Sequence, residues 1–166
     1  MTAEAGQREA LTKALLGEGG LDAAAIQTLA DAIGREHAAS RPAKADAFRA
    51  LLDEAARTPA QRLELSRHAA QIDRRIASER VRVLESGEVD VLFDLARPLA
   101  ALAGLGRTGD ANLLANRYLD VTPQGATGWA LLPLYLSLHA GDALADAILA
   151  PAPPRLIAIG GLSGTG

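Results

Sequence analysis

Apolar residues recur at every third or fourth position over the first part of the chain, which is the spacing of one face of an α-helix. This pattern predicts helices over residues 4–16, 22–37 and 43–57, separated by a glycine-rich break and by Pro42. His37 continues the apolar stripe of the second helix, so we expect a helix-end histidine with a satisfied ring. The chain therefore begins with amphipathic helices that pack on a shared core.

The next helix is predicted to be long and to start at a capping box. In Thr58-Pro59-Ala60-Gln61, the Thr hydroxyl and the Gln side chain can each satisfy a backbone group, and Pro suits the first helical position. One apolar stripe continues from there to Ser86-Gly87, with Leu65, Ile72, Ile76 and Val83 among its members. The stripe either packs within the chain, which we favour, or serves a partner protein or a second copy as a binding face.

The remaining pattern predicts helices over residues 88–103, 110–119 and 129–149, with a loop over 122–128. Three aromatic residues, Tyr118, Trp129 and Tyr135, are expected to anchor the core because no positive charges are interleaved with them.

A proline-rich connector at residues 151–154 is the expected domain boundary. It separates a helical lobe at residues 1–150 from a short segment at residues 155–166.

Composition narrows the class of protein. The sequence is rich in Ala and Leu and only 3% aromatic, which favours helices over sheet. A net charge of −3 gives no attraction to nucleic acid or to an anionic membrane, and the lack of cysteine excludes disulfides and thiolate chemistry. The first residues lack the features of a signal peptide, and Pro133 interrupts the longest uncharged segment. We therefore expect a cytoplasmic protein that binds neither nucleic acid nor membrane.

The last residues resemble the first half of a nucleotide-binding P-loop. A short β-branched run at residues 156–160 is typical of a buried strand. It leads into G-x-x-x-x-G, formed by Gly161, Leu162, Ser163, Gly164, Thr165 and Gly166. The Lys that reaches the phosphates and the Ser or Thr that holds magnesium do not follow. These six residues are the predicted nucleotide-binding segment, but we expect neither ATP nor magnesium to bind tightly.

Three further motifs resemble the C-terminal helical lobe of bacterial aminoglycoside-phosphotransferase-like proteins. They are Asp90-Val91-Leu92-Phe93-Asp94-Leu95-Ala96, Asn112-Leu113-Leu114-Ala115-Asn116-Arg117-Tyr118-Leu119-Asp120 and Ala130-Leu131-Leu132-Pro133-Leu134-Tyr135. More narrowly, they resemble the group in which this lobe leads into a P-loop kinase or AAA-type ATPase domain. The resemblance covers residues 88–166 and, more weakly, 21–37. The expected fold is mainly α, a multi-helix bundle-like lobe with one C-terminal β-strand leading into an incomplete P-loop.

The resemblance implies transfer of phosphate from ATP with magnesium in complete relatives. Their catalytic His-Gly-Asp loop does not occur in this sequence, and His68-Ala69-Ala70 is its nearest positional match. The resemblance also implies that Asp90 and Asp94 brace the helix against that loop. Taken by themselves, these two acids could be paired carboxylates for acid–base or metal chemistry, or helix-start acids, which we favour. His37, His68 and His139 are too scattered to predict a metal site, so no catalytic residue and no metal ligand is predicted.

The expected function is therefore that of an incomplete or degenerate member of this phosphotransferase-like and P-loop kinase family, inactive by itself. The alternative is a non-enzymatic helical module that binds a partner or dimerises through Leu65, Ile72, Ile76 and Val83. A truncated reading frame is the third interpretation.

Overall fold

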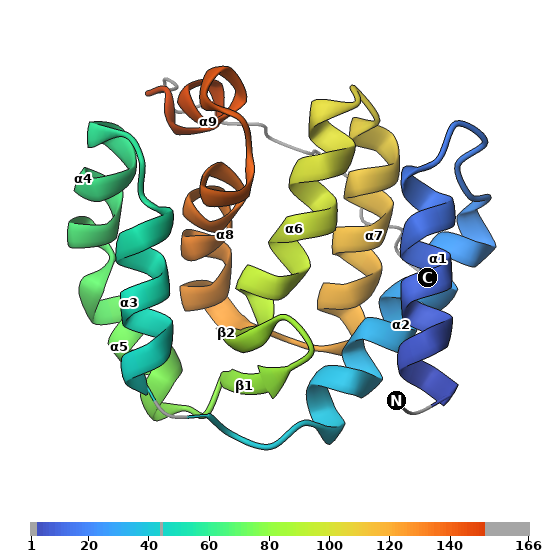
Figure 1. Ribbon diagram of the computed structural model, residues 1–166, viewed down its shortest axis with the longest axis horizontal. Coiled ribbons are helices and arrows are strands. Elements are labelled where there is room, and N and C mark those ends of the chain that lie inside the picture. Colours follow the sequence, from blue (N-terminus) through green and yellow to red (C-terminus); the bar gives the residue numbers. More distant parts are fainter. Residues whose placement is uncertain (1–2, 44, 152–166) are drawn as a thin grey trace, which may run out of the picture.

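The computed structural model describes residues 3–43 and 45–151, and it is mainly α-helical as predicted (Figure 1). Nine helices and one two-stranded sheet make up this part of the chain. Their order is α1 (Ala3–Leu16), α2 (Ala23–Ala39), α3 (Ala45–Ala55), α4 (Pro59–Arg67), α5 (Ala69–Ala77), β1 (Val81–Leu84), β2 (Gly87–Asp90), α6 (Val91–Gly104), α7 (Thr108–Val121), α8 (Gly125–His139) and α9 (Asp142–Leu149).

The first four helices begin close to their predicted positions. Asp22 caps α2 by accepting a hydrogen bond from the backbone N–H of Ala25 at 2.8 Å. The predicted capping box opens α4, where the Thr58 hydroxyl accepts from the N–H of Gln61 at 3.2 Å and the Gln61 side chain accepts from the N–H of Thr58 at 2.9 Å. Local capping chemistry was therefore a sound guide to where these helices start.

The prediction of one long helix up to Ser86-Gly87 is wrong. The helix breaks at His68, α5 ends at Ala77, and Glu79 has a left-handed backbone with φ of 55°. The chain then forms an antiparallel hairpin in which Val81 pairs with Asp90. The β-branched residues of Val81-Arg82-Val83 and the glycine of the turn favour strands over a helix, so the following helix starts at Val91 rather than at residue 88.

The last predicted helix is also divided. α8 begins at Gly125, inside the predicted loop, and the chain turns at Ala140 and Gly141 before α9. The extended backbone of Ala140, with ψ of 158°, ends α8, and Gly141 precedes the first turn of α9. None of the described helices is both long and apolar enough to span a bilayer.

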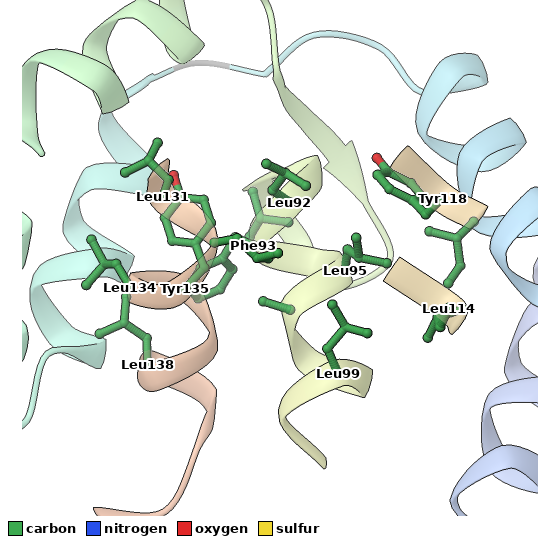
Figure 2. Packing of buried hydrophobic residues seen from close by; sticks show 14 of the residues in the cluster. Leu92, Phe93, Leu95, Leu99, Leu114, Tyr118, Leu131, Leu134, Tyr135 and Leu138 are labelled. Carbon is green, nitrogen blue, oxygen red and sulfur yellow. The ribbon is translucent and has the colours of Figure 1, made fainter. Parts of the chain in front are cut away.

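The core is centred on α6, which lies between α7 and α8 (Figure 2). Leu92, Leu95 and Leu102 on this helix are fully buried. Tyr118 on α7 and Tyr135 on α8 are buried as predicted, whereas the side chain of Trp129 is 52% exposed, so its assignment to the core is wrong. Helix α6 is therefore the central element of the core.

Candidate functional site

The predicted nucleotide-binding segment lies outside the part of the chain that the structure describes. It consists of Gly161, Leu162, Ser163, Gly164, Thr165 and Gly166. The predicted strand at residues 156–160 lies outside it too, as does the linker apart from Pro151. Nucleotide binding by this segment stays a prediction, and the helical lobe supplies the chemistry that can be located.

Asp94 lies in the first turn of α6 and joins it to three other parts of the fold. Its Oδ2 accepts hydrogen bonds from Nε2 of His37 on α2, at 3.0 Å, and from the guanidinium of Arg8 on α1. Its Oδ1 accepts from the Ser86 hydroxyl in the hairpin turn at 2.7 Å. Arg8 also donates to Oε2 of Glu36 at 2.7 Å. We call these side chains, together with Tyr118, the Asp94 network.

The ring of His37 is bonded at both nitrogens, which confirms the prediction of a satisfied helix-end histidine. Nε2 pairs with the Asp94 carboxylate at 3.0 Å, and Nδ1 pairs with the Tyr118 hydroxyl across 2.8 Å. Both side chains are buried. Burial raises the pKa of Tyr118, and the negative charge of Asp90 raises it further, so the hydroxyl stays protonated.

The Asp94 carboxylate is ionised in this network. Burial raises its pKa, but the hydrogen bond from His37 and the positive charge of Arg8 outweigh burial, so the pKa lies below its usual value. In turn, burial lowers the pKa of Arg8, and the charges of Asp94 and Glu36 outweigh this effect and raise it. A carboxylate that is this acidic and already accepts three hydrogen bonds is a poor general base.

Asp90 forms a second network at the start of the same helix, with Arg75 and Gln124. Its carboxylate accepts from Arg75 Nε at 2.5 Å and Nη2 at 2.7 Å, and its Oδ1 caps α6 by accepting from the N–H of Leu92 at 2.8 Å. Arg75 Nη2 also donates to the Gln124 side chain at 2.9 Å. The interpretation of Asp90 and Asp94 as helix-start acids is confirmed, since one caps α6 and the other lies in its first turn.

Beside Asp94, a cleft of about 420 Å³ lies between α1, α6 and the hairpin turn. The two helices run in the same direction (Figure 1). Arg8 contacts Asp94 in the first half of each helix, and Arg107, just after α6, donates to the Leu15 carbonyl at the end of α1. The end of the cleft near the hairpin turn is therefore polar, with Arg8 and Asp94 in its wall. Two turns further along, Leu16 and Ala101 make the opposite end apolar.

The histidines lie in separate surroundings. His139 donates from Nε2 to the Phe93 carbonyl at 2.9 Å, and His68 lies 3.5 Å from the carboxylate of Glu64. Burial lowers the pKa of His139. Within residues 3–43 and 45–151, no three His, Cys, Asp or Glu side chains are arranged to hold a metal ion.

The predicted partner face does not form one helical stripe. Ile72 on α5 is 4% exposed and lies in the core, which confirms intramolecular packing for this residue. Leu65 on α4 and Ile76 on α5 are partly buried against the core, and Val83 is half-buried on β1. Leu65 and Ile72 also line a groove of about 480 Å³ between α3 and the α4–α5 segment. A partner at this groove stays a prediction.

Sequence reasoning did not identify most partners of the two acids. The charge of Arg75 favours a surface position, largely off the apolar stripe, but the structure buries this residue beside Asp90. Arg8 lies 86 positions from Asp94, and Gln124 lies 49 positions from Arg75, so only the tertiary packing brings these groups together. Ser86 is eight positions from Asp94 and reaches it through the hairpin turn, which was not predicted. The one signal available was that Arg75 lies three positions after the apolar Ile72, and therefore close to the same helix face.

In comparisons with known proteins, no family profile, curated protein or solved structure matches the chain.

Proposed function

We propose that the helical lobe is a non-catalytic ligand-binding module, derived from a phosphotransferase-like lobe that no longer transfers phosphate. One observation carries the proposal: the Asp94 network borders an open cleft, while its carboxylate is fully engaged by protein groups. The site is thus suited to holding a molecule rather than to taking a proton from it. The relationship to phosphotransferase-like proteins rests on the sequence motifs alone.

The argument against catalysis concerns the two acids. Activation of an acceptor hydroxyl requires a carboxylate within hydrogen-bond reach and with a pKa suited to taking its proton. Asp94 is held by three side chains and has a lowered pKa. Asp90 is 0% exposed and is bonded to Arg75 and to the α6 backbone. Neither acid is presented to a substrate in the way that a general base is.

The argument for binding concerns the cleft. Its volume of about 420 Å³ falls within the range of small-molecule sites, about 300–1,000 Å³. Polar groups that fix orientation lie at one end, and apolar groups that contribute burial lie at the other. The ion pair between Arg8 and Asp94 holds the polar end in place before any ligand arrives.

Two measurements on the full chain test this function. With Mg-ATP, we expect no phosphate release above background and the same calorimetric trace for wild type and Gly164→Val. In a ligand-observed NMR screen of small fragments, we expect hits that Ala101→Phe removes, because the larger side chain fills the apolar end of the cleft.

Either of two results would overturn the proposal. Turnover of ATP that is lost in Asp94→Asn would restore catalysis to the lobe. A fragment screen without a single hit sensitive to Ala101→Phe would mean that the cleft binds nothing. The matched control for the screen is Ala60→Phe on the exposed side of α4, which leaves the cleft unchanged.

A further inference from the structure

We infer that the cleft between α1 and α6 takes a small zwitterion with an apolar side chain, of the class of the free apolar α-amino acids. This inference rests on the proposed function, since it names the ligand class for the same cleft. Two observations lead to it. Within the described residues, some charged side chains of the cleft wall are already paired and others are not, and the unpaired ones follow a definite order along α1 and α6.

The wall carries both signs of charge. The Arg8–Asp94 pair neutralises itself, with Glu36 as a further partner of the arginine. Four exposed wall residues remain, two cations and two anions: Lys13, Arg97, Glu9 and Glu85. None of the four forms an ion pair within the described part of the chain. A simple anion or cation would meet attraction and repulsion together, whereas a zwitterion can satisfy both signs.

These charges follow one another along the cleft. Glu9 is one residue after Arg8, and Glu85 adjoins Ser86, so both anions lie at the polar end beside the hairpin turn. Lys13 lies one helical turn further along α1, about 5 Å. Arg97 lies nearly one turn beyond Asp94 on α6. A ligand ammonium is therefore directed toward the hairpin end, and its carboxylate toward the middle of the cleft.

Uncharged groups support the same orientation. Thr12 also lines the cleft, one turn along α1 from Arg8, and a hydroxyl is a suitable donor to a carboxylate. Beyond it, Leu16 and Ala101 provide the apolar end that would enclose an aliphatic side chain.

The test compares three probes that share one hydrocarbon body: leucine, 4-methylpentanoate, which lacks the amine, and 3-methylbutylamine, which lacks the carboxylate. Calorimetry with the full chain should give saturable binding of leucine in the millimolar range or tighter. Each single-charge probe should bind about tenfold or more weakly, because one charge-assisted contact is lost.

Two variants test the assigned ends. Glu9→Gln and Arg97→Gln should each weaken leucine binding by about tenfold. Both side chains are exposed, so the thermal unfolding midpoint should not change. Arg67→Gln, an exposed arginine on α4, is the matched control and should leave leucine binding unchanged.

The outcomes separate this inference from the proposed function. If fragments bind in the cleft but leucine, valine, isoleucine and methionine do not, the zwitterion inference is wrong and the binding module stands. If 4-methylpentanoate binds as tightly as leucine, the ligand is a simple anion and the inference is likewise overturned. If neither fragments nor amino acids bind, both proposals fail.

Discussion

Asp90 caps α6 and Asp94 lies in its first turn, yet the networks of these two acids have different surroundings. Asp90 is 0% exposed and its partner Arg75 is 2% exposed. The packing there is close, since a Cβ added at Gly128 would lie 3.2 Å from Arg75 Nη1. Asp94 is 4% exposed, but its partner Arg8 is 18% exposed and lines the cleft. The Asp90 network is closed to solvent, whereas the Asp94 network has one open side.

The difference shows how the start of one helix can carry both a closed ion pair and an ion pair that borders a cleft. When a partner of a closed pair is removed, the other charge is left in the protein interior without compensation. Beside a cleft, the remaining charge can turn toward water or a second partner, as Arg8 can toward Glu36. Identical substitutions of the two acids should therefore have unequal effects on stability.

The largest effect is expected for Asp90→Asn. The amide keeps the shape of the side chain and can still cap α6, but it leaves the buried guanidinium of Arg75 without a counter-charge. We expect the free energy of unfolding to fall by about 3–5 kcal/mol. Urea denaturation at pH 7, followed by circular dichroism of the helices, measures this change.

Two further variants sharpen this result. Adding Arg75→Met to Asp90→Asn removes the stranded charge, so the double variant should be more stable than Asp90→Asn alone. Asp110→Asn breaks the partly exposed pair with Arg107 and should cost less than about 1 kcal/mol. An Asp90→Asn protein no less stable than Asp110→Asn would show that the Asp90 network is not closed.

Asp94→Asn should have an intermediate effect, about 2 kcal/mol at pH 7, because hydrogen bonds to a charged group are lost while Arg8 keeps Glu36. This effect should depend on pH. The pKa of Asp94 is lowered in the folded protein, so its contribution is present above the unfolded pKa of about 4 and is lost as the pH falls toward the folded pKa.

Urea denaturation of wild type and Asp94→Asn between about pH 5 and pH 2 tests this dependence. The difference in unfolding free energy should shrink over that interval, since wild type loses a stabilising term that the variant does not have. A difference that stays constant down to pH 2 would contradict an ionised, paired Asp94. Asp22→Asn, at the exposed cap of α2, is the matched control because Asn caps a helix as well as Asp.

The elements that the sequence predicted well are those specified by neighbouring residues. The Asp22 cap, the capping box at Thr58 and Gln61, and the apolar face of α2 each depend on groups within one helical turn. The hairpin at residues 81–90 was missed because an apolar stripe was continued through it, although Val81, Val83 and Gly87 fit strand–turn–strand chemistry.

The site depends on contacts between distant parts of the chain, which local patterns do not specify. Asp94 is bonded to Arg8 and His37, which are separated from it by 86 and 57 positions. The sequence identified Asp94 as a helix-start acid, but gave no reason for α1 to pack beside α6. The cleft follows from that packing, so it could be found only once the helices had been placed.

The smallest effects concern the tyrosines that reach the two networks. The Tyr118 hydroxyl lies 2.8 Å from His37 Nδ1, so Tyr118→Phe leaves a buried nitrogen unpaired and should cost about 1 kcal/mol. Tyr135 is the matched control, because its hydroxyl is 3.5 Å from Asp90 Oδ2, at the limit of a hydrogen bond, and Arg75 already satisfies that carboxylate. Urea denaturation should therefore rank Tyr135→Phe as the milder change. The opposite order would mean that the closed Asp90 network depends on the Tyr135 hydroxyl more than the open Asp94 network depends on Tyr118.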